Sequence, residues 1–256
     1  MSYDSVQRHL AIEKLVTRAG IESQERKYYR VRSARWYGGI VTADCVGCGL
    51  LCEFCWVSDA VMFHPADVGK FYTPKEIADE LVALAKRKHL NQLRVSGGEP
   101  TTGKRHLLEL LDQLQNKGYN FILETNGILI GHDENYAQEL SKYDFIHARV
   151  SLKGCNQQEF ATLTGAKPED YTLQLKSLQH LVKAGVSCHP SVMISFSSNK
   201  NLQHIIEQLK QINPRLAENL ELEELILYPH VNKRLQKHNL KPSTSHTPNN
   251  IPPQQI

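Results

Sequence analysis

Four cysteines lie within eleven residues of the chain, as Cys45-Val-Gly-Cys48-Gly-Leu-Leu-Cys52-Glu-Phe-Cys55. The last three are separated by three and by two residues, a spacing that suits three corners of one iron–sulfur cube. Thiolates are the usual ligands of such clusters, and a cube held by only three protein thiolates leaves one iron open to a small molecule. The sequence therefore predicts a [4Fe-4S] cluster held by Cys48, Cys52 and Cys55.

Other uses of these cysteines remain open at this point. Zinc sites also use cysteine pairs, but their pairs usually stand about a dozen or more residues apart, whereas three residues separate Cys48 from Cys52. A fourth ligand at Cys45 would close the cube and make the protein a non-catalytic electron carrier. We expect Cys45 to be a bystander at a strand end, or a thiol on the substrate side.

A disulfide framework is disfavoured by the size of the chain and by its first residues. At 256 residues the chain is long enough to bury a core, so it has no need of covalent staples. It starts without an apolar export segment and contains no apolar run long enough to span a bilayer. These features predict a reducing, cytoplasmic location and no membrane partner.

Alternating strand and helix patterns surround the cysteines. Strand-like segments occur at about residues 39–43, 93–96, 121–123, 145–150, 191–194 and 225–227. Helical spacing of apolar residues follows from about Pro74 and again across residues 107–114. This alternation predicts parallel βα units, in which every strand-to-helix loop lies at one end of the sheet. Six units predict an α/β fold, a partial (β/α)6 TIM-like barrel, with a doubly wound open sheet as the alternative.

The cysteine spacing, with Phe54 before the last cysteine, resembles the signature of radical S-adenosylmethionine (radical SAM) enzymes. The segment Gly97-Gly98-Glu99-Pro100 is similar to the family's Gly-Gly-Glu segment, and Glu124-Thr125-Asn126-Gly127 occupies the next strand end as it often does in relatives. The resemblance covers about residues 40 to 230. It implies an enzyme whose [4Fe-4S] cluster cleaves S-adenosylmethionine reductively, giving a 5′-deoxyadenosyl radical that abstracts hydrogen from a substrate. It also implies an external one-electron donor, flavodoxin-like or ferredoxin-like.

The glycine pair and the glutamate that follows it are the first candidate S-adenosylmethionine contacts. Gly97 and Gly98 carry no Cβ, so their backbone can approach a bound ligand closely. The resemblance implies that Glu99 faces the methionine ammonium as an acceptor. The alternative is an ordinary turn that leads into a helix starting at Pro100.

Two further strand ends supply the remaining candidate contacts. Thr125 and Asn126 offer hydrogen bonds to the ribose or methionine groups, although Asn-Gly is also a common turn pair. Ser151 and Lys153 share a face if the strand continues, which lets Lys153 pair with the methionine carboxylate. Their spacing resembles the Asp-x-Lys motif of glycyl-radical activating enzymes, with serine in place of aspartate. Catalytic residues beyond these contacts cannot be chosen from the sequence.

The two ends of the chain differ from its centre in composition. We expect a helical and basic extension over residues 1–34, a core over 35–230, and a helix remnant with a disordered polar tail over 231–256. Basic and aromatic residues alternate in the stretch 26–37, a pattern able to bind RNA, but the net charge of only +3 gives this weak support. The substrate class therefore stays open between a small molecule, RNA and a partner protein that receives a glycyl radical.

Overall fold

The protein is described by a computed structural model that covers residues 2–255, apart from the side chain of residue 254. The helices are α1 (Ser5–Val16), α2 (Asp59–Phe63), α3 (Pro74–Lys88), α4 (Lys104–Leu114), α5 (Ile128–His132), α6 (Glu134–Leu140), α7 (Gln157–Thr164), α8 (Tyr171–Lys183), α9 (Asn199–Ile212), α10 (Pro214–Glu218) and α11 (Pro229–Lys237). The strands are β1 (Thr17–Ala19), β2 (Gln24–Ala34), β3 (Ile40–Cys45), β4 (Lys70–Tyr72), β5 (Gln92–Gly97), β6 (Asn120–Thr125), β7 (Ile146–Leu152), β8 (Cys188–Met193), β9 (Glu221–Glu223), β10 (Leu225–Ile226) and β11 (Ser245–His246).

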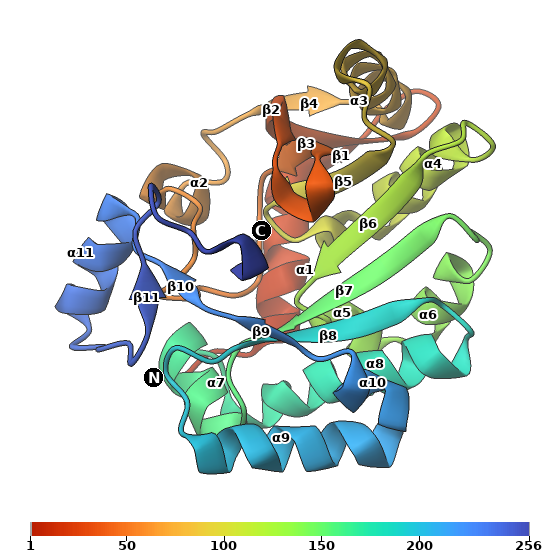
Figure 1. Ribbon diagram of the computed structural model, residues 1–256. Helices are drawn as coiled ribbons and strands as arrows, with labels where there is room; N and C mark the ends of the chain where they lie inside the picture. The colour runs from red at the N-terminus through yellow and green to blue at the C-terminus, as the bar shows by residue number, and fades with distance from the viewer. Residues whose placement is uncertain (1, 256) are drawn as a thin grey trace.

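Six parallel strands form the centre of the molecule, in the order β3, β5, β6, β7, β8 and β9. Helices lie along the outer face of this curved sheet, and the carboxyl ends of the strands point toward α2, α11 and the C-terminal segment (Figure 1). The outermost strands, β1 and β9, do not pair with each other within residues 2–255, so the barrel is partial. The predicted α/β fold with a partial barrel is confirmed.

Local sequence explains why these elements form. Helix α3 begins at a capping box in which Thr73 and Glu76 satisfy each other's backbone N–H groups, and it buries Ile77 and Leu81 against the sheet. Strand β3 is buried at every position, as expected of a parallel strand covered on both faces. None of the described helices is both long and apolar enough to cross a membrane.

The N-terminal segment differs from the separate basic extension that the sequence suggested. Strand β2 pairs antiparallel with β3 and so belongs to the main sheet. The side chains of Arg26, Lys27 and Tyr28 are consecutive and all buried, so both faces of the strand are covered at these positions. Residue 34 therefore does not mark a boundary between two structural units.

The C-terminal part also differs from expectation in two respects. The sixth strand of the barrel is β9, whereas the predicted segment 225–227 contains β10, which pairs with β11 in a separate small sheet. The tail that was expected to be disordered lies against the barrel, where Leu227 N–H donates to the His246 carbonyl at 2.8 Å and Ser243 N–H donates to the Ser195 carbonyl at 2.7 Å. These backbone bonds do not depend on apolar periodicity, so the polar sequence gives no sign of them. The first and last residues of the predicted ranges lie outside the described residues.

Candidate active site

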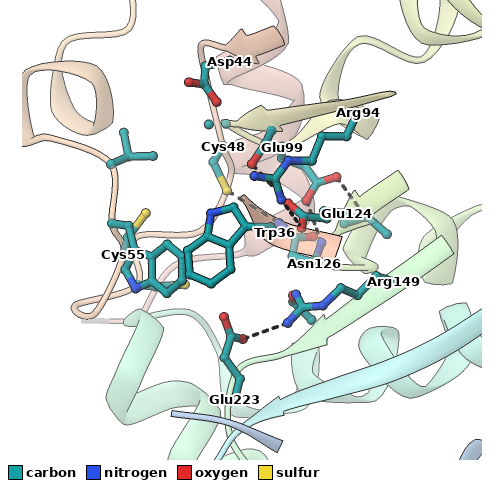
Figure 2. A pocket seen from close by; sticks show the side chains of 18 of the residues that line it. Trp36, Asp44, Cys48, Cys55, Arg94, Glu99, Glu124, Asn126, Arg149 and Glu223 are labelled. Atoms are coloured by element: carbon teal, nitrogen blue, oxygen red, sulfur yellow. Dashed lines mark hydrogen bonds and ion pairs between the residues drawn. The ribbon is translucent and has the colours of Figure 1, made fainter. Parts of the chain in front are cut away.

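A cavity of about 470 Å³ lies at the carboxyl-terminal ends of the parallel strands. Figure 2 shows side chains from several strands, and from the cysteine loop after β3, pointing into it. All ten residues selected from the sequence line this cavity: Cys48, Cys52, Cys55, Gly97, Gly98, Glu99, Thr125, Asn126, Ser151 and Lys153. The fold thus brings together motifs that are separated by up to about a hundred residues, as expected for loops at one end of a parallel sheet.

The three candidate cluster ligands come from one short loop at the cavity wall. Leu50 N–H and the Asn126 Nδ2 amide donate to the Cys48 sulfur at 3.4 and 3.6 Å, and Cys55 N–H donates to the Cys52 carbonyl at 3.0 Å. Burial raises the pKa of Cys48 well above its ordinary value and that of Cys52 to about 12. Lys153 opposes part of the rise at Cys52. These thiols therefore need a bound cation to become thiolates, as ligands of a metal cluster do.

The three thiols of Cys48, Cys52 and Cys55 suit an iron–sulfur cluster better than a single metal ion. Within residues 2–255, no group of three or more His, Cys, Asp or Glu side chains is arranged to hold a single metal ion. In a cube each thiolate binds its own iron atom, so three ligands need only surround the cluster. The fourth cysteine of the loop region, Cys45, is not among the described residues that line the cavity. Its buried thiol instead accepts a hydrogen bond from Arg26 Nη2 at 3.3 Å.

Glycine is required at positions 97 and 98 because the backbone there lies directly against the backbone of the cysteine loop. A Cβ at Gly98 would lie 2.3 Å from the Gly47 carbonyl oxygen, and Gly97 has a φ of +83°. Two backbone bonds hold the segments together, from Gly98 N–H to the Cys45 carbonyl at 2.8 Å and from Glu99 N–H to the Gly47 carbonyl at 2.7 Å. The close approach expected toward a ligand is thus, in the structure, an approach to the cysteine loop itself.

Replacing Gly98 with alanine should displace the cysteine loop. We expect the free energy of unfolding to fall by about 1–3 kcal/mol, the usual cost of overpacking, and the iron bound after anaerobic reconstitution to fall as well. The control is Gly118→Ala, which adds a Cβ in open space at a φ of +78° and strains only the backbone. This control should lose stability but keep its iron, as measured by iron analysis and thermal melting. Full iron content in the Gly98 variant would contradict this interpretation.

Most of the hydrogen-bonding capacity of the Glu99 carboxylate is used by donors within the protein. Its Oε1 accepts hydrogen bonds from Thr101 N–H at 3.1 Å, from Thr101 Oγ1 at 2.7 Å and from Thr125 Oγ1 at 2.7 Å. Its Oε2 accepts one, from Asn126 N–H at 2.7 Å. Glu99, Thr125 and Asn126 therefore join the loop after β5 to the end of β6. Oε2 retains capacity for one further donor, because a carboxylate oxygen can accept two.

Ser151 is hydrogen-bonded within the protein, whereas Lys153 has no carboxylate partner in the described part of the chain. Ser151 Oγ accepts a hydrogen bond from Arg149 Nη1 at 2.9 Å. The Lys153 ammonium lies 5.8 Å from the centre of the Phe54 ring, and no ion pair joins it to a carboxylate within the described part of the chain. Lys153 thus presents a positive charge to the cavity, beside the cysteines.

A largely buried ion pair between Arg94 and Glu124 also lines the cavity, and Arg94 is not among the residues picked out from the sequence. Arg94 Nη1 donates to Glu124 Oε1 at 2.6 Å (Figure 2). The Tyr37 hydroxyl donates to the same oxygen at 2.6 Å. Burial by itself would raise the pKa of Glu124, but Arg94 and Arg149 outweigh it and hold that pKa below its ordinary value. Glu124 is therefore ionised and firmly held.

A second cluster of charges lies beside the first. Arg149 donates to Glu221 from Nε at 2.8 Å and from Nη2 at 2.7 Å, and His189 Nε2 lies 3.1 Å from the same carboxylate. A signal exists in the sequence for Arg149, because Arg149-Val-Ser151 places polar side chains at every second position of a largely apolar strand, whereas the three-residue β9 shows no such pattern. Alternation within a barrel strand marks the residues that face the interior.

The family follows from a comparison with known proteins. The radical SAM superfamily matches residues 44–209, which is more than half of the chain. The protein is a radical SAM enzyme. Members of this superfamily use a [4Fe-4S] cluster and S-adenosylmethionine, and they receive electrons from an external reductant. The matched region contains all ten candidate residues.

The named relatives include enzymes with different activities, so they do not assign this chain to one subfamily. A probable GTP 3′,8-cyclase of Methanococcus aeolicus is 32% identical over 143 residues, which cover 54% of this chain and 44% of that protein. A 7-carboxy-7-deazaguanine synthase of Methanocaldococcus jannaschii is 27% identical over 184 residues, covering 67% and 68%. The chain spans about half the length of the first curated relatives that it matches.

A solved structure supports the fold. SuiB of Streptococcus suis bound to S-adenosylmethionine superposes with a TM-score of 0.57, covering 79% of this chain and 48% of that one. Its sequence identity to this chain is 15%, so the likeness concerns the fold alone. It agrees with the partial barrel of parallel strands described above.

Proposed function

We propose that this protein cleaves S-adenosylmethionine reductively and uses the resulting radical to take hydrogen from a small organic substrate held in the cavity. The observation that supports it most is the convergence of all ten candidate residues on one cavity. When bound there, the cluster supplies the electron that splits S-adenosylmethionine into methionine and a 5′-deoxyadenosyl radical. Cys48, Cys52 and Cys55 hold the cluster in this proposal.

The remaining residues position the cosubstrate in this proposal. Lys153 pairs with the methionine carboxylate, since its ammonium has no protein carboxylate partner in the described chain. Glu99 accepts the methionine ammonium through the free capacity of Oε2, while Thr125 and Asn126 keep that carboxylate in place. Ser151 supports the same end of the cosubstrate through its contact with Arg149.

A small substrate is favoured over RNA by the N-terminal segment. Most of the basic and aromatic stretch 26–37 lies in strand β2, where Arg26, Lys27 and Tyr28 are buried and so cannot contact a nucleic acid. Two of the relatives carry GTP or 7-deazaguanine in their names, so a small nitrogen heterocycle belongs to the proposal. Glycyl-radical activation of a partner protein stays as the alternative, and a flavodoxin-like or ferredoxin-like protein in a reducing cytoplasm is the proposed electron donor.

One assay tests the proposal directly. The protein is reconstituted anaerobically with iron and sulfide, reduced with dithionite and supplied with S-adenosylmethionine. We expect 5′-deoxyadenosine and methionine in equal amounts, measured by liquid chromatography. A fully loaded and reducible cluster that produces neither compound would contradict the proposal.

A further inference from the structure

Six carboxylates line the cavity, and five of them accept hydrogen bonds from other groups of the protein. The occupied ones are Asp44, held by Arg30 and Arg32; Glu99, held by Thr101, Thr125 and Asn126; Glu124, held by Tyr37, Arg94 and Ser96; Glu221, held by Arg149; and Glu224, held by His246. The sixth is Glu223, the last residue of β9.

The Glu223 carboxylate accepts no hydrogen bond from residues 2–255. Its nearest cation is Arg149, with Nη2 3.7 Å from Glu223 Oε2, beyond hydrogen-bonding distance. Both hydrogens of that nitrogen are already used, because Nη2 donates to Ser191 Oγ and to Glu221 Oε1, each at 2.7 Å. The Glu223 side chain is only 19% exposed. A largely buried carboxylate without donors is unfavourable, so its donors are expected to come from a ligand.

Flat aromatic surface lies in the same cavity. The rings of Trp36 and Trp56 are 5.5 Å apart between centroids, at an interplanar angle of 30°, and both residues line the cavity. Figure 2 shows the Trp36 indole in the space between Cys55, Arg149 and Glu223. Half-buried indoles that line a ligand cavity favour a planar ring that can pack against them.

We propose that Glu223 recognises the substrate, and that the substrate is a small planar nitrogen heterocycle with two adjacent N–H donors, as on the edge of a guanine-type ring. The proposal rests on the proposed function and names the substrate class of that site. The two carboxylate oxygens of Glu223 accept the two parallel N–H groups, and the ring lies against Trp36 and Trp56. Glu223 is thus a specificity-determining residue, distinct from the residues assigned to the cluster and cosubstrate.

Equilibrium binding of nucleosides tests this assignment independently of turnover. Guanosine carries both N–H donors, inosine lacks the exocyclic amine, and adenosine lacks the ring N–H. We expect the reconstituted protein with S-adenosylmethionine to bind guanosine about tenfold or more tightly than inosine, the discrimination usual for one bidentate contact. Calorimetry under anaerobic conditions measures it. Glu223→Gln should remove this preference while leaving S-adenosylmethionine affinity unchanged.

The matched control is Glu224→Gln, since that neighbouring carboxylate already accepts from His246 Nε2 at 2.6 Å. This variant should keep the guanosine preference, and both variants should melt within a few degrees of the parent. Equal binding of guanosine and inosine, no binding of guanosine, or an unchanged preference in the Glu223 variant would overturn the assignment.

Two further results would also overturn it. Loss of S-adenosylmethionine affinity in the Glu223 variant would assign this residue to the cosubstrate. Competition by N-acetylarginine amide as strong as that by guanosine would indicate a peptide guanidinium in place of a heterocycle. Formation of 5′-deoxyadenosine without guanosine binding would reject the substrate class and leave the proposed function intact.

Discussion

Replacing Cys52 with alanine should remove the visible absorption of the reconstituted cluster and, with it, production of 5′-deoxyadenosine. A cube that leaves one iron open needs three thiolates, so the two thiolates that remain in this variant cannot hold it. Absorption spectra, iron content and nucleoside formation measure the effect. We expect activity to fall to background, the largest loss of any substitution considered for this protein.

Cys45→Ala is the matched control from the same segment of chain. Its thiol lies against Arg26 and not at the cavity, so this variant should retain cluster absorption and nucleoside formation. Some loss of stability is expected, because Cys45 is fully buried and its removal leaves a small cavity. Equal loss of the cluster in both variants would contradict the assignment of the three ligands.

Replacing Arg149 with methionine should destabilise the fold strongly. Arg149 is 9% exposed and lies within 4 Å of both Glu221 and Glu223, so its removal leaves these two carboxylates without the arginine charge. We expect a loss of about 3 kcal/mol in the free energy of unfolding, at the low end for a broken buried pair, because Glu221 is 41% exposed. Urea unfolding at neutral pH measures it. A loss below about 1 kcal/mol would contradict this reading of the charges.

The pH dependence of the same variant gives a second readout. Burial alone would raise the pKa of Glu221, but Arg149 and His189 lower it from 4.5 to about 2. The stabilisation from ionised Glu221 is therefore present above about pH 4.5 and is lost as the pH falls toward 2. In the Arg149 variant the guanidinium no longer offsets burial, so this contribution should disappear, and the stability deficit relative to the parent should shrink as the pH falls below about 4.5. The control Arg105→Met removes an exposed pair with Glu109 and should change neither quantity by much.

The parallel core was predictable because its pattern is local and repeated. Each strand such as 93–96 is an apolar run followed by glycine or polar residues, and each helix has apolar residues at helical spacing. The rule that parallel strands place their loops at one end then brings Cys48, Glu99, Asn126 and Lys153 to one cavity. Motif spacing and fold class therefore predicted the contents of the cavity without any coordinates.

The rest depended on contacts that sequence periodicity does not report. Strand β2 alternates basic and aromatic residues like an exposed surface, yet it buries Arg26, whose charge is satisfied by the carbonyls of Glu99 and Pro100. The sixth strand is only three residues long and has glutamates facing inward, so it lacks the apolar pattern of the others. For the same reason Glu223 was not selected from the sequence.

In the proposed function, three thiolates hold a cluster whose fourth iron binds S-adenosylmethionine in this cavity. Electron paramagnetic resonance of the reconstituted, dithionite-reduced protein, recorded with and without S-adenosylmethionine, tests it most directly. We expect the signal of one reduced [4Fe-4S] cluster, whose g values shift when S-adenosylmethionine is added and stay unshifted with a methionine-free control such as adenosine. A fully developed cluster signal that S-adenosylmethionine leaves unchanged would contradict it.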